Sequence, residues 1–398
     1  MTTVRLPLNT ALQTTAARLL TPAPARTCAG RIAGSTSVGP RAYSQSCTPR
    51  QHARQAALRE PFLSPKPVVP GRRNKSPFCV LSPRTPWSGK QGRALYSTQP
   101  AVSQEPTIHS LFETKTGTWQ YVVVDPSTLN SVIIDPVLDY DPSTRTITTQ
   151  SADALLSVVK ENGYKVQWIL ETHAHADHLT AAYYLQKQLA EQQGYRPPIG
   201  IGKRITQVQK LFGGRYGIPA KEYEGNPDKL FDDDEVFEIG DMKATAIHLP
   251  GHTPDHLGYK IGDNVFCGDS IFHVDIGTAR CDFPGGSVNN LWKSARKLLA
   301  MPDHVKIWTG HDYPPDSRGK PVAYMTVKEH KEQNKHLKDG VTEEEFVALR
   351  KERDAMLGEP RLLHQSLQIN IRGGHLPEPT EVGHRLLHLP LKVQGVKL

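Results

Sequence analysis

Short apolar runs alternate with amphipathic stretches from about residue 105 to residue 356, and this alternation predicts a mixed α/β fold. β-branched and aromatic runs bounded by turn residues predict strands at residues 108–113, 120–125, 131–135, 166–171, 198–201, 235–239, 243–249, 257–261, 265–267 and 305–309. Apolar residues at helical spacing predict helices at residues 152–162, 179–192, 205–212, 288–300, 327–338 and 343–356. This mixture favours a layered α/β domain, while the tail from Gly358 shows no assignable pattern.

The first 100 residues differ from the remainder in charge. They contain 12 Arg and 3 Lys against a single acid, Glu60, whereas the rest of the chain is slightly acidic. Two interpretations fit this composition: a basic arm that binds nucleic acid, or a mitochondrial presequence, which is Arg-rich and poor in acids. We favour the presequence, because residues 2–20 can form an amphipathic helix and aromatic residues for base stacking are few.

The segment Arg93-Ala-Leu-Tyr-Ser97 is similar to a matrix-protease cleavage site. We therefore expect residues 1–97 to form a disordered leader, and the mature protein to reside in the mitochondrial matrix. No run of eighteen or more apolar residues occurs, which excludes an ordinary membrane-spanning helix. The five cysteines, without paired spacing, argue against a disulfide-stapled secreted fold.

A cluster of metal-ligand residue types follows the expected buried strand at 166–171. It reads Thr-His-Ala-His-Ala-Asp-His, and its candidate ligands are His173, His175, Asp177 and His178. Imidazole and carboxylate are ligands of zinc and iron, and a tight loop with small alanines lets them converge. A polar surface loop is the plain alternative, but it does not require four ligand types directly after a buried strand. We therefore expect a metal site here.

Three later strands end in a similar way, with a glycine followed by a ligand-type residue. His252 lies in Leu-Pro-Gly-His-Thr, Asp269 in Cys-Gly-Asp-Ser and His311 in Trp-Thr-Gly-His-Asp. Each motif alone is ordinary turn chemistry. Together they predict that strand ends bring these ligands into one crevice.

These four motifs, in this order, resemble the metallo-β-lactamase superfamily over roughly residues 104–320. The resemblance implies an α/β fold of the αββα sandwich type, with the metal site at one edge of the two sheets. It implies a catalytic domain at residues 104–320, with C-terminal helices and a tail packed on it at residues 321–398. In the superfamily pattern, one metal is held by His173, His175 and His252 and a second by Asp177, His178 and His311, with Asp269 between them.

A second set of motifs is similar to the persulfide dioxygenases (sulfur dioxygenases), and especially to their bacterial biofilm-associated branch. The motifs are Gly277-Thr-Ala-Arg-Cys-Asp-Phe-Pro-Gly-Gly286, Gly310-His-Asp-Tyr313 and Leu357-Gly-Glu-Pro-Arg-Leu362. This resemblance implies one Fe(II) per chain at the catalytic centre, held by a facial triad of His173, His252 and Asp269. The residues expected to orient the ligands and accept protons are then His175, Asp177, His178 and His311.

The same resemblance implies that glutathione persulfide and O2 are converted to sulfite and glutathione. Arg280 is expected to bind a glutathione carboxylate with its planar guanidinium, beside Asp282, and Tyr313 to donate a hydrogen bond near the substrate sulfur. Asp312 is expected to hold its loop rather than to react. Animal members of the family have threonine where this chain has Cys281, which leaves fine substrate detail and the role of this cysteine open.

In the mitochondrial matrix such an enzyme would act beside a sulfide-oxidising quinone enzyme and a rhodanese. We expect no nucleic-acid or membrane partner, and the fold is compatible with a monomer or a homodimer. The main alternative is a binuclear hydrolase of the glyoxalase II type (hydroxyacylglutathione hydrolase), with two Zn(II) per chain bound by all seven ligands. The Arg-Cys-Asp-Phe segment at residues 280–283 favours the dioxygenase.

Overall fold

The structure, a computed structural model, describes residues 105–395. The leader expected at residues 1–97 lies outside this part of the chain. Within the described residues, no helix combines the length and the apolar character needed to cross a membrane.

Two six-stranded sheets form the centre of the described domain. The first contains, in spatial order, β1 (Thr107–Glu113), β2 (Thr118–Val124), β3 (Asn130–Ile134), β6 (Lys165–Leu170), β8 (Ile199–Gly202) and β9 (Lys229–Phe231). The second contains β10 (Glu235–Ile239), β11 (Met242–His248), β12 (Leu257–Ile261), β13 (Asn264–Phe266), β14 (Lys306–Trp308) and β15 (Tyr324–Thr326). A small third sheet contains β5 (Thr146–Thr148), β4 (Val137–Asp141) and β7 (Leu179–Thr180).

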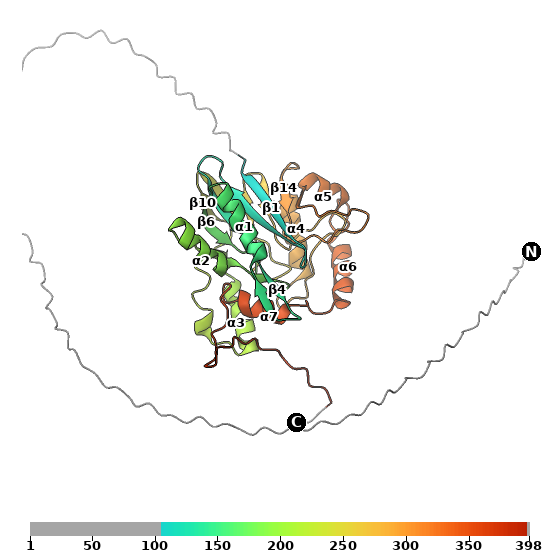
Figure 1. Cartoon of the computed structure of the whole chain (residues 1–398). Helices are drawn as coiled ribbons and strands as arrows, with labels where there is room; N and C mark the ends of the chain where they lie inside the picture. The colour runs from blue at the N-terminus through green and yellow to red at the C-terminus, as the bar shows by residue number, and fades with distance from the viewer. Residues whose placement is uncertain (1–104, 396–398) are drawn as a thin grey trace, which may run out of the picture. The chain divides into compact units, whose positions relative to one another are not determined.

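Helices cover the outer faces of both large sheets, which gives the αββα sandwich that the sequence predicts (Figure 1). Leu155 and Leu185 pack two helices against the first sheet, and Leu298 and Phe346 pack two others behind the second. The helices are α1 (Gln150–Glu161), α2 (Ala182–Gln193), α3 (Ile205–Tyr216), α4 (Val288–Leu299), α5 (Val327–Gln333), α6 (Glu343–Ala355) and α7 (Leu363–Asn370), with a short 3₁₀ helix at Ala220–Glu222.

Strand β2 shows why the sequence forms a layered core. All seven of its residues are buried. Tyr121 and Val123 lie in the core between the two sheets, whereas Val122 and Val124 lie in the core under α1 and α2. Successive strand side chains point to opposite faces, so a strand that is buried at every position must be covered on both sides.

Each predicted strand is present, with ends shifted by at most two residues. The helix predicted at 327–338 is too long, because α5 ends at Gln333, where Asn334 leaves the helical conformation and binds the carbonyl of Gly277. The helix predicted at 179–192 begins three residues later, after the short strand β7. The unassigned tail contains α7, which no sequence pattern indicated.

The ligand-bearing loops meet at one edge of the sandwich. β3 and β6 run parallel in the first sheet, as do β13 and β14 in the second. At this edge the backbone N–H of Leu257 donates to the carbonyl of Thr172 (2.7 Å), which joins the two sheets. The loops after β6, β11, β13 and β14 therefore lie side by side.

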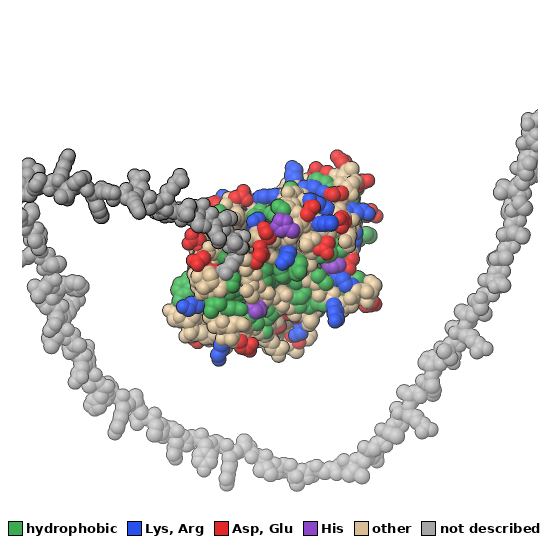
Figure 2. All heavy atoms as spheres, turned by 90° about the horizontal axis from the view of Figure 1, so that it is seen from above, with side chains coloured by type: hydrophobic (Ala, Val, Ile, Leu, Met, Phe, Trp, Pro, Cys, Tyr) green, Lys and Arg blue, Asp and Glu red, His purple; other side chains and the backbone are tan. Residues whose placement is uncertain are grey.

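The surface mixes both signs of charge. Figure 2 shows Lys and Arg side chains interspersed with Asp and Glu on one face of the domain. The chain beyond residue 100 has a small excess of acids.

Candidate metal centre

The loop after β6 is buried and held from both sides. Asp135, at the end of β3, accepts hydrogen bonds from the backbone N–H and the hydroxyl of Thr172 (2.7 and 2.9 Å). Asp255 accepts from the backbone N–H of Ala174 (2.9 Å). The loop cannot move outward without breaking these buried carboxylate bonds, so its imidazoles have fixed directions.

The structure brings together the three residues expected to hold iron. One ligand atom from each of His173, His252 and Asp269 lies within 4.8 Å of the other two. Oδ2 of Asp269 is 3.6 Å from Nε2 of His252 and 3.9 Å from Nε2 of His173. The three residues come from three different loops, so this group is produced by the sheet edge and not by local sequence.

The four other predicted ligands lie against this group. His175, Asp177 and His178 form a second cluster whose ligand atoms are within 4.8 Å of one another. Nε2 of His311 is 3.1 Å from Oδ2 of Asp177 and 3.5 Å from Oδ2 of Asp269. Asp269 therefore lies between the two groups, as the superfamily pattern implies.

Each histidine of the cluster has one ring nitrogen beside a partner within the protein. Nδ1 of His252 donates to the carbonyl of Arg280 (2.7 Å), and Nδ1 of His178 and of His311 lie 3.2 Å from backbone carbonyls. His175 uses Nε2 instead, which faces Asp135 at 3.1 Å. A hydrogen bond to one nitrogen fixes the tautomer and leaves the other nitrogen as a lone-pair donor.

The opposite nitrogens are the atoms that a metal requires. Within residues 105–395, Nε2 of His173 and of His178, Nδ1 of His175 and Oδ1 of Asp269 are buried without a hydrogen-bond partner. Buried polar atoms are rarely left unpaired, because their desolvation costs about 1–3 kcal/mol each. This set of imidazole and carboxylate donors fits zinc or iron, so the residues present match a metal cofactor.

The pKa values of two histidines in the cluster shift in opposite directions. Burial and the neighbouring imidazoles hold the pKa of His173 well below its usual range, which keeps this ring neutral and able to coordinate. Burial alone would also lower the pKa of His311, but Asp269 and Asp177 outweigh it and raise this pKa to about 9.

Glycines before the ligands allow the loops to approach closely. A Cβ on Gly310 would lie 2.4 Å from Oδ1 of Asp269, and a Cβ on Gly268 would lie 2.5 Å from the hydroxyl of Thr172. Only a residue without a side chain fits at these two positions. Close packing therefore requires the glycine that precedes Asp269 and the glycine that precedes His311.

A cavity of about 570 Å³ opens onto the cluster. Its inner wall includes His252, Asp269 and His311, and Phe272 and Ile276 add apolar surface. Its lining also contains the basic residues Lys115, Arg280, Arg353 and Arg361, which are exposed or half-buried, and the buried Arg350. The cavity therefore has metal-ligand candidates at its base. Its exposed or half-buried basic residues are called the cationic mouth.

The residues predicted to bind substrate are at this cavity, but two of them bind each other. Arg280 donates from Nε and Nη2 to the carboxylate of Asp282, and Nη2 also donates to the carbonyl of Gly358 (2.8 Å). Tyr313 is 52 % exposed, and its ring stacks on that of His311 at 5.7 Å between centroids. Arg280 thus already has a carboxylate partner within the chain.

The neighbouring residues Asp312 and Cys281 have structural contacts. The carboxylate of Asp312 accepts hydrogen bonds from Arg318 and from the backbone of Val322, so it holds its loop as expected. Cys281 is buried, and burial raises the pKa of its thiol to about 12. A neutral, buried thiol is unreactive, which favours a structural role for Cys281.

Several residues of the site were not found from the sequence. His256 stacks on His173 and accepts the backbone N–H of Asp269 at Nε2 (3.0 Å), and Glu171 lies 3.4 Å from Nε2 of His175. Asn370 binds the backbone of the histidine loop from the C-terminal helix α7. His256 and Glu171 flank recognised motifs, which is the one local signal that could have indicated them.

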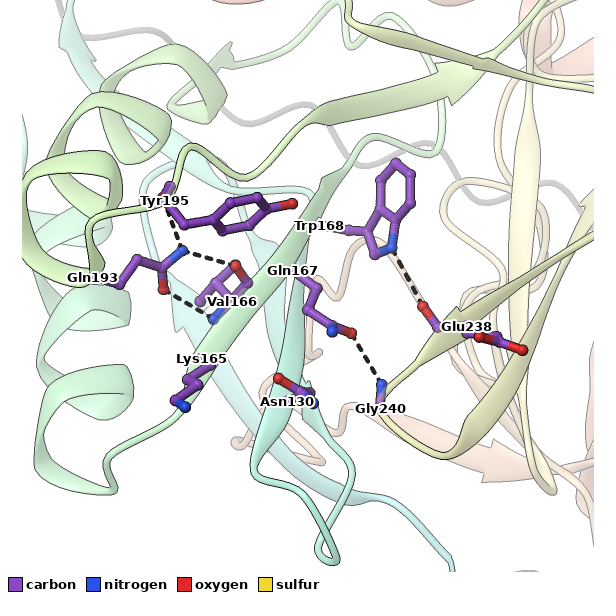
Figure 3. A pocket seen from close by; sticks show the side chains of 9 residues that line it. All are labelled: Asn130, Lys165, Val166, Gln167, Trp168, Gln193, Tyr195, Glu238 and Gly240. Atoms are coloured by element: carbon purple, nitrogen blue, oxygen red, sulfur yellow. Dashed lines mark hydrogen bonds between the residues drawn. The ribbon is translucent and has the colours of Figure 1, made fainter. Parts of the chain in front are cut away.

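A second cavity of similar volume, about 580 Å³, lies at the opposite end of β6 (Figure 3). Its amides bind the backbone nearby: Gln193 donates to the carbonyl of Val166 (2.9 Å), and Gln167 accepts from the N–H of Gly240 (2.9 Å). Trp168 donates to a backbone carbonyl as well. Its lining holds no His, Cys or Asp, so it offers no ligand set comparable with that of the first cavity.

Comparisons with known proteins agree with this geometry. The family model described as "Metallo-beta-lactamase superfamily" matches residues 114–311. A "Beta-lactamase hydrolase-like protein" of Xylella fastidiosa (strain Temecula1) is 44% identical over 301 residues, which cover 75% of this chain and 68% of that protein. "Glyoxylase B2" of Dictyostelium discoideum is 42% identical over 293 residues, covering 73% of this chain and 98% of that protein.

Among solved structures, that of ETHE1 from Myxococcus xanthus is similar, with a TM-score of 0.53 and 24% sequence identity. The match covers 68% of this chain and 100% of that chain. At this level of identity the likeness shows the fold.

Proposed function

The chain belongs to the metallo-β-lactamase superfamily, and on that premise we propose that it is a mononuclear non-haem Fe(II) persulfide dioxygenase. It oxidises glutathione persulfide with O2 to sulfite and glutathione. The proposed setting is sulfide oxidation in the mitochondrial matrix, beside a sulfide-oxidising quinone enzyme and a rhodanese. The observation that carries the proposal is the group of His173, His252 and Asp269 at the floor of a cavity lined by the dioxygenase-type segment around Arg280.

Two imidazoles and one carboxylate form the donor set of a facial triad. When it is bound there, iron supplies the one-electron and O2 chemistry that the reaction requires. The protein contributes orientation: the hydrogen bond from His252 to the Arg280 carbonyl and the bond from the Asp269 backbone to His256 fix both ligands in place. Phe272 and Ile276 give the cavity apolar walls that limit the access of water.

The cationic mouth supports an anionic substrate. Lys115, Arg353 and Arg361 are exposed, and none of them forms an ion pair within the described part of the chain. Glutathione carries two carboxylates, which would be attracted by these charges. Because Arg280 is already paired with Asp282, we assign the carboxylate contacts to these three residues, with Arg280 and Asp282 shaping the wall beside them.

The second candidate function is thioester hydrolysis by a binuclear zinc centre of the glyoxalase II type. The complete cluster of His175, Asp177 and His178 beside His311 favours it, because a second metal would have ligands there. The names of the two relatives, one "hydrolase-like" and one "Glyoxylase", point in the same direction.

Oxygen uptake tests the proposal. The purified chain is loaded anaerobically with Fe(II), and glutathione persulfide is added in an oxygen electrode. The expected result is iron-dependent uptake matched by sulfite, lost in His252→Ala and retained in His304→Ala, a matched change at an exposed histidine. Absence of uptake from folded, iron-loaded protein, together with hydrolysis of S-lactoylglutathione by the zinc form, would overturn the dioxygenase in favour of the hydrolase.

A further inference from the structure

We infer that the C-terminal helices α6 and α7 complete the metal centre, with Asn370 as a positioning residue for the ligand-bearing histidine loop and Asp354 as a positioning residue for the segment 278–281, which orients His252. Both helices lie beyond residue 311, where the match to the family model ends. Helix α7 binds the histidine loop and α6 binds the segment beside His252, each through buried side-chain hydrogen bonds.

Asn370, the last residue of α7, binds both ends of the histidine loop. Its Nδ2 donates to the carbonyls of His175 (2.8 Å) and His178 (2.9 Å). Its Oδ1 accepts the backbone N–H of Thr180 (2.9 Å). The amide thus uses both of its donor hydrogens and its acceptor on the six residues 175–180, and it is 8 % exposed.

The loop that Asn370 binds carries four candidate ligands in six residues. Loops of this kind need backbone partners, because their buried carbonyls do not pair within a helix or sheet. Asn370 supplies two such partners from a helix about 190 residues further along the chain. The spacing of His175 and His178 at the cluster therefore depends on where α7 packs.

Asp354, on α6, acts on the other side of the cavity. Its Oδ2 accepts the backbone N–H of Cys281 (2.9 Å), and its Oδ1 accepts from Arg350. Arg350 in turn donates to the carbonyl of Thr278 (3.1 Å). This buried ion pair therefore forms hydrogen bonds with the backbone at both ends of the segment 278–281.

The segment 278–281, which α6 binds, contains the backbone carbonyl that orients His252. The carbonyl of Arg280 lies within it and accepts the hydrogen bond from Nδ1 of His252 (2.7 Å). A shift of this segment would remove the acceptor and release the imidazole. A hydrogen-bonded outer partner of a metal ligand typically contributes 10- to 100-fold to metal affinity.

This inference rests on the metal site of the proposed function and not on its reaction, so the test measures binding. Co(II) serves as the probe in the full chain, with affinity from competition with a chelator and ligand geometry from the visible absorption spectrum. Asn370→Asp preserves shape but turns a carboxylate oxygen toward two carbonyls. We expect at least a tenfold loss of Co(II) affinity and an altered spectrum.

Asn264→Asp is the matched control. Asn264 is also buried and also uses its amide for hydrogen bonds, to Glu105 and from Trp308, but it lies at the opposite end of β13 from Asp269. This variant should lose stability while keeping the Co(II) affinity and spectrum. Circular dichroism of each variant checks folding, and Asn370→Ser replaces Asn370→Asp in the same comparison if the latter does not fold.

Asp354→Asn tests the second contact independently. It should lower Co(II) affinity and change the spectrum through His252, with the histidine loop untouched. Native affinity and spectrum in folded variants at both positions would overturn the inference. Weakened binding in these variants supports it even if the iron-loaded native chain takes up no oxygen, so its failure and that of the proposed reaction can be told apart.

Discussion

Nδ1 of His252 donates its hydrogen to the backbone carbonyl of Arg280 at 2.7 Å. The contact joins a metal-ligand candidate to the segment that forms the cavity wall. The orientation of His252 is therefore coupled to the position of residues 278–281, and through them to Asp354 on α6. A ligand candidate and the wall of the cavity are therefore held as one unit.

Metal removal should lower stability. The cluster buries several imidazole and carboxylate atoms that have no partner within the described residues, and a bound metal would satisfy them. Binding at a free metal concentration of 100 times Kd adds about 2.7 kcal/mol to the free energy of unfolding. Thermal unfolding with and without chelator should show this difference in the native chain. Asp269→Asn should reduce it, and an unchanged melting temperature in the native chain would contradict a metal at this site.

The cationic mouth should set KM rather than kcat. Replacing both Arg353 and Arg361 with alanine removes two exposed charges from the cavity, and exposed ion pairs contribute roughly 0.2–1 kcal/mol each. We expect the KM for glutathione persulfide to rise about 2- to 30-fold with kcat unchanged, as for a loss of uniform binding. The effect should shrink at high salt. Arg385→Ala, an exposed arginine away from this cavity, is the control, and an equal KM in both proteins would refute the assignment.

Gly117 should not tolerate a side chain. Its φ is +70°, and a Cβ would lie 2.7 Å from Cε1 of Tyr313 and 2.9 Å from the carbonyl oxygen of Asp312. Gly117→Ala should lower the free energy of unfolding by about 1–3 kcal/mol and displace Tyr313 at the cavity. Gly163→Ala has a similar φ of +69° with no atom within 4 Å, so it measures the backbone cost alone. If urea unfolding gave the same loss of unfolding free energy for both variants, the surroundings of Gly117 would have adjusted to the new side chain and the prediction would be wrong.

Stability should rise with pH between about 4 and 6.5 because of His330. Burial lowers the pKa of His330 from 6.5 to about 4. In that interval the unfolded chain binds the proton and the folded chain does not, so acidification favours unfolding, by at most about 3 kcal/mol. His330→Asn removes the titrating group and should flatten this part of the profile. Urea unfolding at a series of pH values checks it, and parallel profiles for the two proteins would exclude His330 as the source.

The positions of the strands along the chain and the main ligand motifs could be predicted from the sequence. Apolar runs that form strands between two helix layers are recognisable locally, as in β2, where every position is buried. The ligand candidates also follow their strands directly, so the sheet edge brings His173, His252, Asp269 and His311 together as expected. Glycine before Asp269 and His311 was a local signal, but its cause is the close approach of loops that are far apart in the sequence.

Helix α7 could not be predicted in this way. Six of its eight residues are buried, among them Ser366, Gln368 and Asn370, so it has no alternation between a polar and an apolar face. The polar residues are buried because they have distant partners. Gln368 binds the backbone of His388, and Asn370 binds the histidine loop.

The sequence by itself determined the layered fold and indicated the candidate ligands, because periodicity and motif spacing depend on neighbouring residues. The tertiary structure decided which nitrogen of each histidine is available, the pairing of Arg280 with Asp282, and the contact of Asn370 with the loop. The contacts of His252 and Asn370 depend on partners far apart in the chain, and Arg280, although it pairs with the nearby Asp282, also binds the carbonyl of Gly358, 78 residues away. Such partners come within 3 Å of one another only when the sheets and helices have packed, and no local pattern records that distance.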